Sequence, residues 1–260
     1  MHCVLHETAR RMSWNMLCHR LIALDLDGTV LTDDKRIADS TKLWVGKAAD
    51  AGVIVTFATG RGRQDALSFV RELDLDSPMV FLNGAEIWGG PGQLLERHFM
   101  DTEDIYRLHQ LTAETGCCFW GYTVETLIQN DWSNDMLHQE WMKYGMYCDD
   151  VDLMAQLRDY VDSWGTVEVT CTSDANMEVT ARGITKARGV RRICEQIGIE
   201  MEAVMAVGDG LNDLDLIEGA GLGVAMGNAA EELKRAADFV TESNEDDGVV
   251  LAIRRCIFGM

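Results

Sequence analysis

The sequence predicts an α/β fold, in which a parallel sheet is covered by helices on both faces and a second, α+β domain is inserted. Three observations support this prediction. Short apolar runs alternate with helical patterns in residues 21–82 and again in residues 186–256, which is typical of parallel strands joined by crossover helices. Several of these runs end abruptly in polar clusters. The residues between the two parts, about 85–182, break the alternation.

The first part is expected to contain three strands and two helices. Apolar runs flanked by turn residues predict buried parallel strands at residues 21–24, 53–58 and 79–82. Helical patterns cover residues 40–51 and 63–73. Right-handed crossovers then bring the carboxyl ends of the strands to one edge of the sheet. Ligands of open α/β sheets bind at that edge.

The first strand ends in two carboxylates one residue apart, Asp25 and Asp27, followed by Gly28 and Thr29. Two negative charges this close repel each other, so we expect a cation beside them. Because all the available ligands are oxygen atoms, the pattern favours Mg²⁺.

A second acidic cluster follows the strand predicted at residues 203–207. It contains Asp209, Asn212 and Asp213, with glycines that allow a tight turn and close approach of a ligand. Taken alone, each acidic pair could be only a turn or a helix cap, since Asp and Gly favour both. Two such layouts far apart along the chain favour one shared site between neighbouring strands.

Two further motifs have both a functional and a structural interpretation. Thr59 and Gly60 end the strand at 53–58 and precede a helix, where a hydroxyl and free amides can bind phosphate, although Thr can also simply cap the helix. Lys186 opens a helix; it is either a solvated surface residue or a cation that neutralises charge shared by phosphate and carboxylate. For Arg61 and Arg63 we favour ion pairs with surface acids over contact with a substrate.

The second part continues with a strand at residues 221–225 and helices at 229–236 and 246–256. In the insertion, alternating patterns predict strands at 166–170 and 177–180, and helical patterns cover 102–115, 134–144 and 151–160. The turn at residues 89–92 is expected to join two strands of the insertion. Five tryptophans lie there, and we favour a role in packing that small domain over a role in a substrate pocket: Trp88, Trp120, Trp132, Trp141 and Trp164.

The order of the motifs, DLDGT at residues 25–29, TGR at 59–61, Lys186 and GDGLND at 208–213, resembles the haloacid dehalogenase (HAD) superfamily. The likeness is to Cof-type phosphatases with a type IIB cap, and it runs from about Leu21 to about Ile257. Shorter segments at 83–85, 225–229, 237–241 and 246–249 also fit it. The resemblance implies a Rossmann-like core of residues 21–84 and 183–260, a cap of residues 85–182, and hinges near Gly84 and Gly183.

The resemblance also implies a role for each motif residue. Asp25 would be the nucleophile, and Asp27 would be the general acid and base, with a pKa raised in the bound state. The Asp25 carboxylate, the main-chain carbonyl of Asp27 and the Asp209 carboxylate would hold Mg²⁺. Phosphate would be bound by Thr59, Gly60, Lys186 and Asn212, and Asp213 would support the metal or the lysine.

Composition narrows the function classes. The chain has 260 residues, a formal net charge of −20 and eight cysteines. Because no basic stripe is present, we expect no nucleic-acid partner and no anionic membrane partner. No CxxC pair or zinc-like spacing occurs, and no apolar stretch is long enough to span a bilayer. We therefore expect reduced thiols and a cytoplasmic protein, either a monomer or a small homo-oligomer.

Residues 1–20 mix His, Arg, Cys and Trp without an apolar segment, so they are not expected to be a secretory signal. We interpret them as a disordered leader or as a start placed too early, with Met12 or Met16 as other possible starts.

The sequence thus predicts a magnesium-dependent phosphatase that hydrolyses a small phosphorylated metabolite, a sugar phosphate or similar, through a phospho-aspartyl intermediate. Two alternatives remain open. A phosphomutase or other phosphotransferase would use the same residues and return the phosphoryl group to a sugar phosphate. A non-catalytic metabolite sensor would be expected to lack the nucleophile or the acid, yet both are present.

Overall fold

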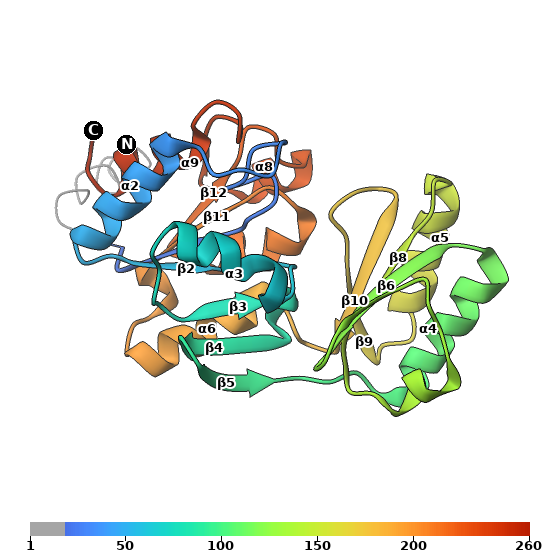
Figure 1. Cartoon of the computed structure of the whole chain (residues 1–260). Helices are drawn as coiled ribbons and strands as arrows, with labels where there is room; N and C mark the ends of the chain where they lie inside the picture. Colours follow the sequence, from blue (N-terminus) through green and yellow to red (C-terminus); the bar gives the residue numbers. More distant parts are fainter. Residues whose placement is uncertain (1–18) are drawn as a thin grey trace, which may run out of the picture.

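Five parallel strands form the central sheet of this computed structural model, which describes residues 19–260 (Figure 1). Their spatial order is β13-β12-β11-β1-β2, and a parallel bridge between Ala58 and Val80 extends the sheet to β3. The expected leader lies outside the described residues, except for His19 and Arg20. The strand bounds are β1 (Leu21–Leu24), β2 (Ile54–Phe57), β3 (Met79–Phe81), β11 (Val204–Gly208), β12 (Leu222–Ala225) and β13 (Phe239–Val240).

Strands from the two parts of the core lie on opposite sides of β1. The segment after β1 leads to β2 and β3 on one side, whereas β11, on the other side of β1, leads to β12 and β13. Right-handed crossovers in opposite directions place helices on opposite faces. Accordingly α2 packs with α9, and α6 packs with α7. The helices are α2 (Asp39–Asp50), α3 (Arg63–Glu72), α6 (Lys186–Ile197), α7 (Leu214–Gly219), α8 (Glu231–Ala236) and α9 (Gly248–Cys256).

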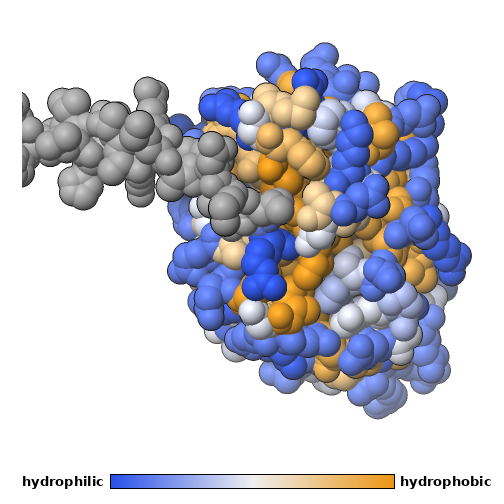
Figure 2. All heavy atoms as spheres, turned by 90° about the vertical axis from the view of Figure 1, so that its left-hand side faces the viewer, coloured by the Kyte–Doolittle hydropathy of each residue, from blue (hydrophilic) through white to orange (hydrophobic). Residues whose placement is uncertain are grey.

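The end of this core that carries α2 and the C-terminus faces the viewer in Figure 2, where hydrophobic residues form a band between hydrophilic ones. Trp44 of α2 and Phe258, just after α9, make an edge-to-face contact with ring centroids 5.6 Å apart. Lys47 and Arg254 lie over the Trp44 ring. Aromatic and cation–π contacts therefore join the first and last helices of the core.

The turn at residues 89–92 joins two strands, but they lie beside the core and not in the inserted domain. The hairpin of β4 (Glu86–Gly90) and β5 (Gln93–Arg97) pairs with β3, and Ile87 is fully buried in the core cluster. Gly84 is also packed inside, because a Cβ there would lie 2.4 Å from the carbonyl oxygen of Thr185. The chain therefore leaves the core after β5, not near Gly84 as expected; sequence patterning alone cannot tell which sheet a hairpin joins.

The remaining insertion, residues 99–181, is called the cap here. Its antiparallel sheet has the order β7-β6-β8-β10-β9, and α4 and α5 cover one face of it (Figure 1). A separate hydrophobic cluster fills the space between sheet and helices. The elements are α4 (Thr102–Thr115), β6 (Cys118–Thr123), β7 (Leu127–Gln129), β8 (Trp141–Tyr147), α5 (Val151–Asp162), β9 (Val167–Thr170) and β10 (Asn176–Ala181).

The prediction of a helix at residues 134–144 is wrong. A short 3₁₀ turn, η2 (Asn134–His138), precedes the strand β8. This strand is central, between β6 and β10, and its first six residues are all buried. A strand covered on both faces has no polar alternation to reveal it. The predicted packing role holds for the inserted domain at three tryptophans, since Trp132, Trp141 and Trp164 belong to the cap cluster. It is wrong for the other two, because Trp88 and Trp120 pack on the core cluster.

Candidate active site

Asp25 and Asp209 come together because the strands that carry them are neighbours with matched ends. β1 pairs in parallel with β11, Leu24 lies opposite Val207, and the Asp25 amide donates to the Val207 carbonyl at 3.0 Å. This is also the point where the strand order reverses direction, which in open α/β sheets leaves a crevice at the carboxyl edge. The shared site predicted between the two acidic motifs is therefore present as geometry.

Lys186 lies buried between two of the carboxylates. Its ammonium group is 2.9 Å from Asp25 Oδ1 and 2.7 Å from Asp213 Oδ1. Burial alone would lower the pKa of Lys186, but Asp213 and Asp25 outweigh it and raise that pKa. The solvated alternative for Lys186 is therefore wrong. Because it stays charged, the lysine offsets part of the negative charge around Asp25.

The Asp213 side chain fixes the loop after β11 through hydrogen bonds. Its Oδ1 accepts from Lys186, and its Oδ2 accepts from the amides of Asp209 and Gly210, each at 3.1 Å. Both oxygens are thus engaged by protein donors. This arrangement fits the supporting role that the sequence analysis gave to Asp213.

Gly28 allows Asp209 to approach the first motif. Its φ of +73° lies in the left-handed region, and a Cβ there would lie 2.2 Å from Asp209 Oδ2. The next residue, Thr29, donates its hydroxyl to Asp209 Oδ1 at 3.0 Å. The DGT turn therefore fixes the position of the second carboxylate as well as the first.

The acidic cluster is suited to a divalent cation. One oxygen from each of Asp25, Asp209 and Asp213 lies within 4.8 Å of the others. Burial raises the pKa of Asp25, with Asp213 and Asp209 adding to the rise against Lys186, and burial with Asp213 raises the pKa of Asp209 to about 7. Lys186 therefore leaves the negative charge incompletely compensated. An all-oxygen donor set of this kind fits Mg²⁺.

Thr59 and Gly60 lie across the crevice at the end of β2. Thr59 is almost fully buried, its hydroxyl accepts from the Arg61 amide at 3.1 Å, and no side chain caps α3, whose N-cap is Gly62. The simple helix-cap interpretation of Thr59 is therefore wrong. Both residues line the same cavity as Asp25, Asp209 and Asn212.

The Asp27 carboxylate is bound by two cations that the sequence analysis left out of the site. Arg61 binds it in a bidentate manner at 2.6 and 2.7 Å, and Lys35 donates at 2.7 Å. Burial would raise the pKa of Asp27, but the hydrogen bonds from Arg61 and Lys35 prevail and lower it to about 2. An ion pair with an acid was the interpretation favoured for Arg61, and it is observed. The partner, however, is Asp27 of the first motif and not a surface acid. The sequence analysis expects a raised pKa of Asp27 when substrate is bound. In the structure, where Arg61 and Lys35 hold the carboxylate, the pKa of Asp27 is lowered.

The cap closes over this crevice through polar side chains. Lys143 on β8 donates to the Gly60 carbonyl at 2.8 Å and pairs with Glu178 on β10 at 2.7 Å. Asn83, which follows β3, donates to Glu178 at 2.7 Å, and outside this crevice the Tyr122 hydroxyl donates to Asp65 on α3 at 2.8 Å. The sequence analysis missed Lys143, because a single lysine in an apolar strand carries no signal of its tertiary partner.

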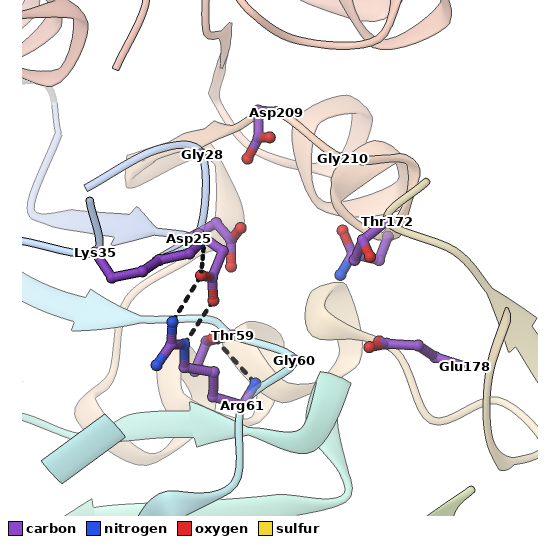
Figure 3. A pocket seen from close by; sticks show the side chains of 12 residues that line it. Asp25, Gly28, Lys35, Thr59, Gly60, Arg61, Thr172, Glu178, Asp209 and Gly210 are labelled. Carbon is purple, nitrogen blue, oxygen red and sulfur yellow. Dashed lines mark hydrogen bonds and ion pairs between the residues drawn. The ribbon is translucent and has the colours of Figure 1, made fainter. Parts of the chain in front are cut away.

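Core and cap together enclose a cavity of about 390 Å³. Its core side presents Asp25, Asp27 and Asp209 with Thr59 and Arg61, and its cap side presents Thr172 and Glu178. Figure 3 shows Asp25, Thr59 and Asp209, which follow β1, β2 and β11, around the same space as Thr172 and Glu178 of the cap. Its walls carry mostly charged and hydrogen-bonding groups, as expected for a phosphorylated ligand.

Comparison with known proteins decides the family. A family model described as haloacid dehalogenase-like hydrolase matches residues 22–146 and 126–253. The chain belongs to the haloacid dehalogenase-like hydrolases. The resemblance noted from the motifs is confirmed, and so is the α/β fold, since the HAD subclass IIB sugar phosphatase BT4131 has a similar structure. The TM-score is 0.81 at 25% identity, and the match covers 92% of this chain and 99% of that one.

Named relatives agree that this HAD chain is a phosphatase. A Bacillus subtilis (strain 168) protein, 5-amino-6-(5-phospho-D-ribitylamino)uracil phosphatase YcsE, is 37% identical over 238 residues, covering 92% of this chain and 96% of the relative. A second protein of that strain with the same activity in its name, YitU, is 31% identical over 255 residues, covering 88% of this chain and 94% of the relative.

Among the described residues, no helix has the length and apolar character to cross a membrane.

Proposed function

We propose that the chain is a Mg²⁺-dependent phosphatase that forms a phospho-aspartyl intermediate on Asp25. The observation that carries the proposal is the setting of Asp25 at the carboxyl edge of β1. Its Oδ1 is held by Lys186, the residue lines the cavity, and Thr59 and Gly60 lie around the same space. Phosphoryl transfer depends mainly on such positioning and charge neutralisation.

The proposed reaction has two steps. The Asp25 carboxylate attacks phosphorus, the bond from phosphorus to the ester oxygen breaks, and Asp27 gives a proton to the leaving oxygen. Water then attacks the acyl phosphate, Asp27 takes the proton, and phosphate leaves with Asp25 restored. Mg²⁺, held by the carboxylates of Asp25 and Asp209 and the main-chain carbonyl of Asp27, would neutralise the charge of the transferring phosphoryl group.

Asp27 must be released from its ion pairs before it can act as an acid. Arg61 and Lys35 both line the cavity and hold the Asp27 carboxylate in its ionised form. A bound phosphate dianion would compete with Asp27 for these cations. Their departure removes the hydrogen bonds that lower the pKa of Asp27, so substrate binding itself would prepare the acid.

For the substrate, we propose 5-amino-6-(5-phospho-D-ribitylamino)uracil as the first candidate, because relatives at 37% and 31% identity carry it in their names. The test is release of inorganic phosphate from a panel of phosphorylated metabolites that includes this compound. Activity is expected with Mg²⁺, is expected to disappear with a chelator, and is expected to return when Mg²⁺ is restored. Hydrolysis that chelation does not change would contradict the metal assignment.

A further inference from the structure

A chain of hydrogen bonds across the cap–core interface has a direction fixed by chemistry. A carboxylate can only accept, so Asn83 must turn its amide nitrogen to Glu178 Oε2. The Asn83 oxygen then faces Asn212, which must turn its own nitrogen toward it, at 3.3 Å. That nitrogen is therefore directed at Asn83 and not at the phosphate, as the resemblance had implied. At the other end, Lys143 donates to the same Glu178 oxygen. These four residues, Lys143, Glu178, Asn83 and Asn212, form the interface network.

This direction leaves two hydrogen-bond acceptors at the cavity. Asn212 is 8% exposed, and its Oδ1 is buried without any partner among the described residues. Glu178 has both of its contacts on Oε2, while Oε1 accepts from no described residue. Both residues line the cavity, and Figure 3 shows the Glu178 carboxylate pointing into it. A buried acceptor without a donor, such as Asn212 Oδ1, is costly, and Glu178 Oε1 offers a second acceptor, so the cavity suits a ligand that supplies donors.

The cations near the cavity are already committed. Lys143 is directed to Glu178 and to the Gly60 carbonyl, and Lys35 and Arg61 are directed to Asp27 until the transferring phosphate competes for them. The cap side therefore offers no free cation among the described residues to bind a second phosphate. Among the described residues, the cap lines the cavity only with Glu178 and the hydroxyl residue Thr172, so these residues offer no ring on which an aromatic group could stack.

We propose that Glu178, together with Asn212, determines specificity by accepting hydrogen bonds from hydroxyl groups of the leaving part of the substrate. The site would select phosphate esters of polyhydroxylated chains over esters of equal length without hydroxyl groups. This inference rests on the proposed phosphatase function and assigns its substrate class. Closure orders the network and thereby positions the acceptors above the phosphate site.

The test compares two five-carbon probes, D-ribitol 5-phosphate and n-pentyl phosphate, by kcat/KM with Mg²⁺. The wild type is expected to prefer the ribitol ester at least about tenfold, as hydrogen bonds to a charged group allow. Glu178→Met removes the acceptor and leaves Lys143 unpaired. The unpaired charge lowers both rates alike, whereas the lost acceptor lowers the preference by about tenfold. Glu178→Gln keeps an oxygen for Asn83 and Lys143 and is expected to give an intermediate preference.

Tyr122→Phe is the matched control, since it removes a cap–core hydrogen bond to Asp65 outside the cavity. It is expected to lower both rates equally and to leave the preference unchanged. The proposal is overturned if Glu178→Met and Glu178→Gln keep the wild-type preference, or if the wild type hydrolyses both esters equally well. Failure of the wild type to release phosphate from either ester, or from any compound of the metabolite panel, would instead overturn the phosphatase mechanism on which the inference rests.

Discussion

Asp25, Asp27, Asp209 and Asp213 are chemically identical, and their neighbours give them different roles. Both carboxylate oxygens of Asp213 accept hydrogen bonds, one from Lys186 and the other from the amides of Asp209 and Gly210. Asp27 is held by Arg61 and Lys35, so its pKa is lowered to about 2. Asp25 and Asp209 are buried in a crevice whose positive charge does not balance its carboxylates, and burial together with the neighbouring carboxylates raises the pKa of each. Asp25 and Asp209 line the cavity, whereas Asp213 does not, and the carboxylate of Asp27 is already paired with two cations, so a metal cation is expected between Asp25 and Asp209.

Asp25→Asn is expected to lower kcat at least about a thousandfold, because a carboxamide is a poor nucleophile toward phosphorus. The unfolding midpoint of the metal-free protein should stay the same or rise, since one of several repelling buried charges is removed. Phosphate release and thermal unfolding measure the two effects. Asp39→Asn, which alters a carboxylate that is 99% exposed, is the control. Near-normal turnover in purified Asp25→Asn would contradict the nucleophile assignment.

Gly28→Ala tests the close approach of the two acidic motifs. An alanine at φ +73° costs about 1–2 kcal/mol of unfolding free energy, and its Cβ would collide with the Asp209 carboxylate. We expect Mg²⁺ affinity and kcat/KM to fall about a hundredfold, as Asp209 is displaced. Calorimetric titration of Mg²⁺ and steady-state kinetics measure these quantities.

Gly52→Ala separates backbone strain from that collision. Gly52 has φ +85°, and nothing lies within 4 Å of an added Cβ. This variant is expected to lose a similar 1–2 kcal/mol of stability while binding Mg²⁺ and turning over substrate as the wild type does. Equal losses of activity in both variants would show that strain alone is responsible.

At the scale of elements, strands β8 and β10 of the cap bring a buried ion pair to the loop after β2. Gly60 is suited to this contact, because a Cβ there would lie only 3.0 Å from Asn83 Oδ1 and 3.2 Å from Glu178 Oε2. Lys143 and Glu178 are almost fully buried at the contact between cap and core, and opening of the cap would expose them. The pair therefore couples closure to the completeness of the site.

Lys143→Met is expected to favour the open cap. Removing one partner of a buried ion pair costs about 3–5 kcal/mol, and opening the cap relieves that cost by returning Glu178 to water. We expect kcat/KM to fall about a hundredfold or more for ribitol and pentyl esters alike, with a larger radius of gyration in solution scattering. Lys42→Met, which removes a surface lysine paired with Asp39 and Glu72, should change neither. An unchanged scattering profile in Lys143→Met would count against this coupling.

The elements show where sequence reasoning succeeds. An apolar run followed directly by Asp25 or Asp209 combines a local pattern with a global rule, since the carboxyl ends of parallel strands meet at one edge. Pattern reading failed at β8, where burial on both faces hides the period, and at β4–β5, where a hairpin near the insertion joined the core sheet.

Across the whole molecule, the motif residues of the crevice were predictable because one strand or helix terminus positions each of them. Lys143, Glu178 and Thr172 were not, because they reach the cavity only through the seating of one domain on another. Arg61 was visible in the motif, but its partner Asp27 could be assigned only in three dimensions. Specificity thus resides where sequence patterns are least informative.

The charge of the whole crevice should make metal-free stability depend on pH. The pKa of Asp209 rises from an ordinary 3.8 to about 7 in the folded state. Between these values the folded protein binds more protons than the unfolded chain, so the free energy of unfolding falls as pH rises. Mg²⁺ competes with those protons, so it should stabilise the protein more as the pH increases.

Thermal unfolding with Mg²⁺ and with chelator, at pH 5.5 and at pH 8, measures this linkage. We expect the Mg²⁺-dependent rise in Tm to be several degrees larger at pH 8. Asp209→Asn removes one titrating carboxylate, so it should flatten the decline of metal-free stability with pH and should abolish most of the Mg²⁺ effect. Asp39→Asn should behave as the wild type in both respects. A Mg²⁺-dependent rise that is equal at the two pH values would mean that the cation does not displace protons from the Asp25 and Asp209 crevice.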